Sequence, residues 1–176
     1  IAIHLPSSGP EIPNPVLTAK EILPGVPKVK VSKDAAWLTK WKNSAAVASE
    51  VIVKKINVET LTGPSVALTL WNQISSDSTL FISPSWPIRH LELYASTRSG
   101  ITTYANRGVN GIDGVISSAA GVAVTKQTKT YLLMGDIAFL HGMGGLNISA
   151  TNQIPNLTVV VADNDGSGIF SQLEQG

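Results

Sequence analysis

Glycine and oxygen-bearing side chains stand together at three places in this sequence, each directly after a short apolar stretch. The first is Gly135 with Asp136, the second is the Asp-Asn-Asp-Gly segment 163–166, and the third is the Asn-Arg-Gly segment 106–108. Carboxylate and amide oxygens are the ligands that hard divalent cations prefer, and glycine lets the backbone come close to a ligand. Asp136 and Asn164 are therefore candidates to share one divalent cation.

Magnesium chemistry fits this combination of residue types. Mg²⁺ takes about six oxygen ligands and usually leaves several of these positions to phosphates and water. The carboxylate of Asp136, the amide oxygen of Asn164 and one backbone carbonyl would leave room for a diphosphate and a water. A single carboxylate would also leave net positive charge to attract that anion. The alternative is that these residues only form turns and cap helices, which is common for any one strand end.

The segments around these residues alternate between strand and helix patterns. Short apolar runs predict strands at 79–83, 100–104, 130–134 and 157–162. Helices are predicted at 62–75, 87–95, 112–124, 137–146 and from 168 onward. Strands that are apolar on both faces and alternate with helices indicate an α/β fold, a parallel sheet with helices on both faces. Ligands bind such sheets outside the carboxyl ends of the strands, which is where Asp136 and Asn164 are expected.

The first third of the chain has a different character. Residues 1–33 are rich in proline, with one plausible strand at 26–31, and we interpret them as the remnant of a middle domain. Residues 34–60 are interpreted as a connector helix and linker, because Trp37, Trp41, Ala45 and Ala48 recur at helical spacing. Residues 61–176 form the main domain. The chain starts at Ile1 and stops just after a predicted helix start, so we expect a fragment truncated at its C-terminus.

Composition excludes several classes of function. A formal charge of +1 gives no electrostatic basis for binding nucleic acid. The absence of cysteine excludes a disulfide framework and a cysteine-ligated metal, and it favours the cytoplasm. No window approaches the roughly 18 apolar residues of a membrane helix. A dinucleotide fold is disfavoured because segment 142–147 (GMGGLN) has Asn147 in place of the third glycine and falls at a predicted helix end.

Gly135-Asp136 followed by Asn164-Asp165-Gly166 resembles the bipartite GD and N-x-G motif of thiamine-diphosphate enzymes. The wider match narrows this to one family, the MenD synthases of menaquinone biosynthesis, which make 2-succinyl-5-enolpyruvyl-6-hydroxy-3-cyclohexene-1-carboxylate. The segments that carry this resemblance are 85–89 (SWPIR), 106–114 (NRGVNGIDG), the small-residue stretch to Gly121, 135–141 (GDIAFLH) and 168–171 (GIFS). It runs from about residue 61 to residue 176, and it makes this region a diphosphate- and magnesium-binding domain.

The resemblance implies a role for each matching residue. Asp136 and Asn164 would bind Mg²⁺ (or Mn²⁺) by side chain and Gly166 by its carbonyl, with Gly135 beside the cofactor. Ile112 would hold thiamine diphosphate in a bent conformation, and Phe170 and Leu173 would line the apolar side of the pocket. Arg89 and Arg107 would bind the carboxylates of 2-oxoglutarate and isochorismate, because guanidinium forks match carboxylates. Ser85 would hydrogen-bond near the reacting groups. For every one of these residues an ordinary role in the core, a turn or a helix remains the alternative.

The resemblance also implies an activity and a missing part. The family decarboxylates 2-oxoglutarate and adds the succinyl-semialdehyde unit to isochorismate, in a homo-oligomer whose site is shared between subunits. The glutamate that activates the cofactor comes from a different domain, and no glutamate of this chain has a matching context. The fragment alone is therefore expected to be inactive. Two alternatives stay open: a non-catalytic α/β module that binds a diphosphate or nucleotide, and an acetolactate-synthase-like relative.

Overall fold

The computed structural model describes residues 28, 34–56, 61–106, 111–147, 156–166 and 168–172. Its backbone divides into two units, Ile1–Ser44 and Ala45–Gly176. The predicted strand at 26–31 lies outside the described residues except for Lys28. The prediction of a middle-domain remnant, a connector and a main domain stays a prediction.

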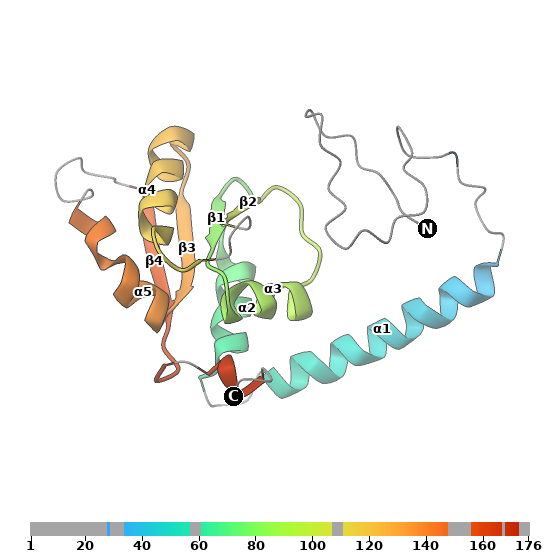
Figure 1. Ribbon diagram of the computed structural model, residues 1–176. Helices are drawn as coiled ribbons and strands as arrows, with labels where there is room; N and C mark the ends of the chain where they lie inside the picture. Colours follow the sequence, from blue (N-terminus) through green and yellow to red (C-terminus); the bar gives the residue numbers. More distant parts are fainter. Residues whose placement is uncertain are drawn as a thin grey trace. The chain divides into compact units, whose positions relative to one another are not determined.

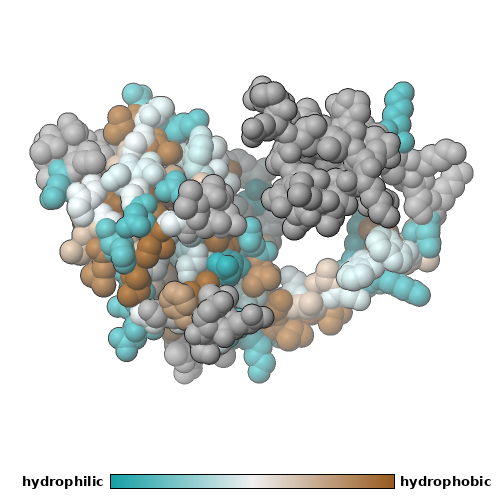
Figure 2. All heavy atoms as spheres, viewed as in Figure 1, coloured by the Kyte–Doolittle hydropathy of each residue, from teal (hydrophilic) through white to brown (hydrophobic). Residues whose placement is uncertain are grey.

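Helix α1 (Ala35–Ile56) begins where the sequence predicts, because the backbone N–H of Trp37 donates to the Asp34 carboxylate at 3.1 Å. None of its residues is buried. The indoles of Trp37 and Trp41 lie one turn apart with ring centroids 6.0 Å apart, and each residue is more than half exposed. Apolar side chains are exposed along the helix, as Figure 2 shows. No helix among the described residues is both long and apolar enough to cross a membrane.

Four parallel strands form the sheet that positions the candidate site (Figure 1). They are β1 (Thr79–Ile82), β2 (Thr102–Ala105), β3 (Thr130–Gly135) and β4 (Leu157–Ala162), in the order β2-β1-β3-β4. β3 and β4 are neighbours, and Gly135 pairs with Ala162 at their carboxyl ends. The chain therefore leaves both strands at the same edge, and the polar segments that begin at Asp136 and Asp163 start side by side.

Helices cover both faces of the sheet, so the predicted fold class is confirmed. Helices α2 (Gly63–Gln73) and α3 (Trp86–Tyr94) pack on one face, and α4 (Val115–Lys126) and α5 (Asp136–Gly142) on the other. Strand β3 serves both cores, since Leu133 faces α2 and α3 whereas Leu132 and Met134 face α4 and α5. This alternation explains why the middle of the strand carries consecutive apolar residues.

The helix starts follow local chemistry. Thr62 caps α2 in a capping box with Ser65, and Pro64 lies in the first turn, so this helix begins where the predicted range 62–75 begins. The helix predicted from residue 112 begins only at Val115, because Gly114 adopts a left-handed backbone with φ of 70°. The helix predicted from residue 168 is only the 3₁₀ turn η2 (Phe170–Gln172) within the described residues.

Two glycines make a matched test of this fold. Gly100→Ala is expected to destabilise the chain by about 2 kcal/mol or more, because Gly100 has φ of 86° and an added Cβ would lie 2.5 Å from the Ser76 carbonyl oxygen. Gly121→Ala is expected to stabilise it by about 1 kcal/mol, because Gly121 lies inside α4 with no atom within 4 Å of an added Cβ. Urea unfolding of the 176-residue chain measures both. Equal midpoints for the two variants would contradict this account.

Candidate functional site

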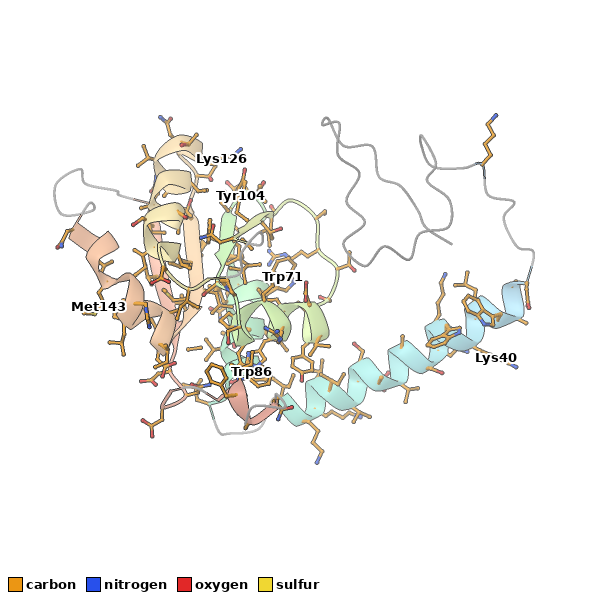
Figure 3. The ribbon with its side chains drawn as sticks, viewed as in Figure 1. Lys40, Trp71, Trp86, Tyr104, Lys126 and Met143 are labelled. Atoms are coloured by element: carbon orange, nitrogen blue, oxygen red, sulfur yellow. The ribbon has the colours of Figure 1, made fainter. Side chains whose placement is uncertain are left out.

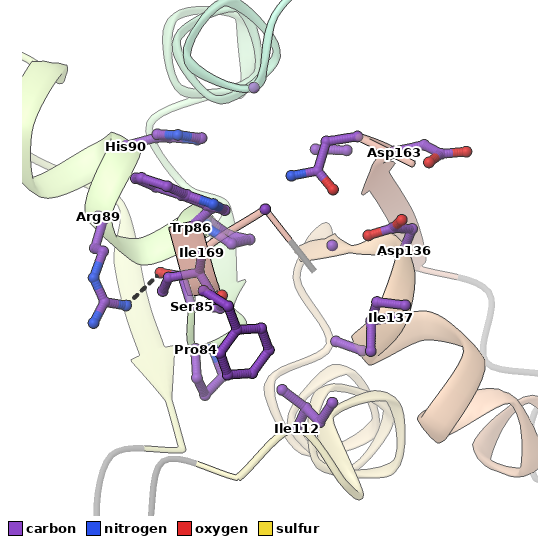
Figure 4. Close-up of a pocket in the computed structure, with 18 residues that line it drawn as sticks. Pro84, Ser85, Trp86, Arg89, His90, Ile112, Asp136, Ile137, Asp163 and Ile169 are labelled. Carbon is purple, nitrogen blue, oxygen red and sulfur yellow. Dashed lines mark hydrogen bonds between the residues drawn. The ribbon is translucent and has the colours of Figure 1, made fainter. Parts of the chain in front are cut away.

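A pocket of about 380 Å³ opens at the carboxyl edge of the sheet. That volume falls within the range of small-molecule and cofactor sites. Its lining comes from the segments that follow β1, β3 and β4, together with Gly63 at the start of α2, Ile112 before α4, and the 168–170 turn. Figure 4 shows Trp86, Arg89 and His90 on one wall, with Asp136 and Asp163 across the cavity from them. This is the place that the sheet topology predicts for a ligand.

The candidate cation ligands meet at one end of this pocket. Asp136 and Asn164 both line it. Gly166 lies next to them, because a Cβ added to Gly166 would stand 4.0 Å from Oδ2 of Asp136. Gly135 also lines the pocket, and a Cβ added there would have no atom within 4 Å, so the backbone leaves open space toward a ligand. One carboxylate, one amide and an accessible backbone stand together at this edge, which is a donor set that suits Mg²⁺.

The turn after β4 is held in an unusual conformation. Asp165 and Gly166 have consecutive positive φ values of 63° and 87°. The carboxylate of Asp163 accepts a hydrogen bond from the Asp165 backbone N–H at 3.0 Å, which closes the turn locally. Asp and Gly are the residue types that tolerate this backbone, so their presence here also has a purely structural reason. The same turn sets Gly166 against the Asp136 carboxylate.

Ser85 and Arg89 lie on the opposite wall, at the start of α3. Ser85 is strained, with φ of 77°, and its side chain makes no capping hydrogen bond. Nη1 of Arg89 donates to the Ser85 carbonyl oxygen at 2.8 Å (Figure 4). Backbone strain of this kind costs about 1–3 kcal/mol and clusters at functional sites. The remaining N–H groups of the exposed Arg89 guanidinium leave it able to bind a carboxylate at the pocket.

Apolar side chains line the rest of the pocket. Ile112 is half-buried and packs against the core cluster of α4 and α5 while also lining the cavity, so the core role and the ligand role coexist. Phe170 lines the pocket with 55% of its surface exposed. A large exposed aromatic beside a cavity is typical of a surface that a ligand or a partner covers.

Several lining residues were not predicted from the sequence, and three of them lie together. Trp86, His90 and Gly63 form one corner, where His90 stacks on Trp86 with ring centroids 5.3 Å apart. His90 also packs so closely on α2 that a Cβ at Gly63 would lie 2.5 Å from its Cε1. Burial lowers the pKa of His90 below its ordinary value, so the imidazole is neutral near pH 7. The four-residue spacing of Trp86, His90 and Tyr94 was the available signal.

Other residues fall outside the described part of the chain or away from the pocket. Arg107 and Leu173 lie outside the described residues, so their predicted roles stay predictions. His141 contacts Asp113 at 3.3 Å, with both side chains largely exposed, and it does not line the pocket. The glycines of segment 142–147 follow a helix, not a strand, and added Cβ atoms at Gly142 and Gly145 would press on Ile116. Gly142 and Gly145 therefore allow close packing against α4.

Comparison with known proteins gives this pocket a family. Residues 85–176 match the family described as thiamine pyrophosphate enzyme, C-terminal TPP binding domain. The chain belongs to the thiamine pyrophosphate enzymes. The matched region begins at Ser85, just before α3, and contains the other three strands and nearly all of the pocket lining. Thiamine pyrophosphate is another name for thiamine diphosphate. The family therefore agrees with the cofactor that the sequence motif predicts.

Named relatives are similar over most of the chain. A 2-succinyl-5-enolpyruvyl-6-hydroxy-3-cyclohexene-1-carboxylate synthase from Saccharopolyspora erythraea is 35% identical over 100% of this chain and 32% of its own length. Synthases of the same name from Listeria monocytogenes and Lysinibacillus sphaericus are 42% and 41% identical over 82% and 81% of the chain, and 25% of their own lengths. The chain thus spans about a third or less of these relatives.

Proposed function

We propose that this chain is the magnesium- and diphosphate-binding part of a MenD-type transferase. The longer enzyme would decarboxylate 2-oxoglutarate and add the succinyl-semialdehyde unit to isochorismate. One observation carries the proposal: the candidate cation ligands and the exposed Arg89 side chain line the same cavity. This reaction needs a site that binds the cofactor in one part and a substrate carboxylate in another. The names of the similar synthases support the choice of reaction.

The cation end fits a magnesium–diphosphate group. Asp136 and Asn164 would bind Mg²⁺ (or Mn²⁺) through side-chain oxygens and Gly166 through its carbonyl, which leaves room for diphosphate oxygens and water. Asp163 lies beside them and keeps this end negative unless a cation is present. The cation is therefore expected to bind together with the diphosphate and to be required for it.

Thiamine diphosphate supplies the electron sink for decarboxylation and carbon–carbon bond formation. The chain's residues would supply orientation and charge. Ile112 presses an apolar side chain into the cavity and would hold the cofactor bent, and Phe170 covers the same apolar side. Arg89 would bind a substrate carboxylate, with Arg107 in the same role, and Leu173 would extend the apolar lining. The strained Ser85 would hydrogen-bond close to the reacting groups.

The Arg89 guanidinium provides the test of substrate binding. Arg89→Ala in the full-length enzyme is expected to lower kcat/KM for 2-oxoglutarate about tenfold to a hundredfold, because a charged pair with a substrate carboxylate is lost. Arg89→Lys should recover only part of this, since an ammonium cannot form the two-pronged pair. Lys126→Ala is the control, because it removes one positive charge at the far end of α4 (Figure 3). Steady-state kinetics that leave kcat/KM of Arg89→Ala unchanged would remove Arg89 from the site.

The choice of reaction has its own test. The full-length protein should consume isochorismate only when 2-oxoglutarate is present. Consumption of pyruvate instead would move the protein to the acetolactate-synthase-like alternative.

The described pocket lining contains no glutamate, which favours a second candidate for the chain taken alone, a non-catalytic diphosphate-binding module. Calorimetry with thiamine diphosphate against NAD, each with Mg²⁺, separates a thiamine site from a nucleotide site.

The remaining expectations concern the whole protein. We infer a homo-oligomer in which a second subunit supplies the activating glutamate, and this stays a prediction. The expectation of a cytoplasmic protein depends on the absence of cysteine alone.

A further inference from the structure

The indole of Trp86 stands in the pocket wall that faces the cation end. Trp86 is the first residue of α3, and its ring stacks on His90 one turn later at 5.3 Å and 14°. His90 in turn stacks on Tyr94 at 6.3 Å. Figure 4 shows the Trp86 and His90 rings lying one above the other at the cavity. This stack holds the plane of the indole and so fixes the direction of its N–H group.

The N–H of Trp86 has no hydrogen-bond acceptor among the described residues. Trp71 shows the usual situation, because its indole N–H donates to the Ser96 carbonyl oxygen at 3.1 Å. The indole N–H of a half-buried tryptophan normally finds a partner, and leaving such a donor unpaired costs free energy. The Trp86 N–H is therefore available to donate a hydrogen bond to a ligand in the pocket.

The space beside the Trp86 N–H is bordered by Gly168. A Cβ added to Gly168 would lie 3.6 Å from Nε1 of Trp86 and 3.1 Å from Nδ2 of Asn164. The indole nitrogen and the amide of a proposed cation ligand thus border one small space, and the glycine keeps that space free of a side chain. All three residues line the pocket.

The charges of the lining indicate the kind of group that this space holds. Asp136 and Asp163 both face the pocket, so an anion there needs a bound cation and N–H donors to offset two carboxylates. Arg89 and His90 are the basic residues of the described lining, and burial lowers the pKa of His90, so its imidazole is uncharged near pH 7. A neutral N–H donor next to Asn164 suits an anionic oxygen that already shares the cation.

We propose that the Trp86 indole N–H donates a hydrogen bond to the diphosphate of thiamine diphosphate. This inference depends on the proposed function, because it places the diphosphate at the Asp136 and Asn164 end. The proposal adds a residue of α3 to a diphosphate-binding site whose other residues follow the ends of β3 and β4. The contact is to a phosphoryl oxygen, and the thiamine rings are not part of it.

Trp86→Phe tests the proposal, because phenylalanine keeps an aromatic ring against His90 and removes the N–H donor together with the smaller ring of the indole. Calorimetry of the 176-residue chain with Mg²⁺ should show about tenfold weaker binding for thiamine diphosphate and for inorganic diphosphate alike, the usual effect of losing a hydrogen bond to a charged group. Trp71→Phe is the matched control: it loses an indole N–H bond away from the pocket and should leave both affinities unchanged.

Each other outcome overturns the inference in a distinct way. Unchanged diphosphate affinity in Trp86→Phe, while Asp136→Asn abolishes binding, overturns the role of the indole and leaves the proposed function standing. A loss confined to thiamine diphosphate would assign Trp86 to the thiamine rings instead. An equal loss in Trp71→Phe would mean a general effect on the fold. No binding to the unaltered chain would overturn both proposals.

A second readout measures binding in the unaltered chain and uses the variant only to assign one resonance. The chain has four tryptophans, so four indole N–H resonances are expected in a proton–nitrogen correlation spectrum. The resonance missing in Trp86→Phe is that of Trp86. Adding Mg²⁺ with inorganic diphosphate to the unaltered chain should move this resonance downfield more than the other three, and an unmoved resonance contradicts the proposal.

Discussion

Asp136→Ala is expected to weaken the binding of thiamine diphosphate in the presence of Mg²⁺ by more than about a hundredfold. Replacing groups that only support a metal ligand costs about 10–100-fold in affinity, so loss of the carboxylate itself should cost at least the upper end. Asp136 is half-buried and lies beside Gly166. Calorimetry with and without Mg²⁺ measures the effect.

Two companion variants separate charge from fold. Asp136→Asn keeps the size of the side chain and removes its charge, and it should lose Mg²⁺ dependence to a similar extent. Asp113→Ala removes an exposed carboxylate that contacts His141 outside the pocket lining, and it should bind the cofactor like the unaltered chain. Cofactor binding that is unchanged in Asp136→Ala would remove the cation from this end of the pocket.

The isolated 176-residue chain is expected to bind thiamine diphosphate with Mg²⁺ and yet to show no measurable release of carbon dioxide from 2-oxoglutarate. The resemblance implies that an acid from another domain lies beside the aminopyrimidine of the cofactor, and Asp136 and Asp163, the carboxylates of the described pocket lining, belong to the proposed cation end instead. Positioned acid–base groups contribute about 10²–10⁴-fold to rates. Without the activating acid, turnover by the chain should therefore be lower than turnover by the full-length enzyme by at least about 10²–10⁴-fold.

The comparison needs both proteins under the same conditions. Carbon dioxide release is measured for the chain and for the full-length enzyme at saturating cofactor and Mg²⁺. Measurable turnover by the chain would refute the prediction and show that a group in this chain activates the cofactor. In that case the pocket, and not another domain, would hold the acid.

Much of the fold could be predicted because it depends on local patterns. The apolar run Leu157–Ala162 is a strand in full, and Thr62 with Pro64 starts α2 as expected. Boundaries were less accurate where single backbone angles decide them. The left-handed Gly114 delays α4 to Val115, and φ at one residue leaves little trace in a pattern of apolar spacing.

The candidate site was predictable only in part. Asp136 and Asn164 were recognisable because parallel strands end at the same edge and the motif joins them. Trp86 and His90 were not, because their four-residue spacing also fits an ordinary amphipathic helix. Only the packing of α3 against α2 and the sheet decides which face of that helix meets the cavity.

By itself the sequence determined the α/β class, the strands that carry the polar segments, and the cofactor family, because apolar periodicity and short motifs are local properties. The tertiary structure decided that β3 and β4 are neighbours, that Gly166 lies against the Asp136 carboxylate, and that Ser85 and Arg89 face them across one cavity. These depend on strand order and helix packing, which bring together residues far apart in the chain through interactions that no local pattern encodes.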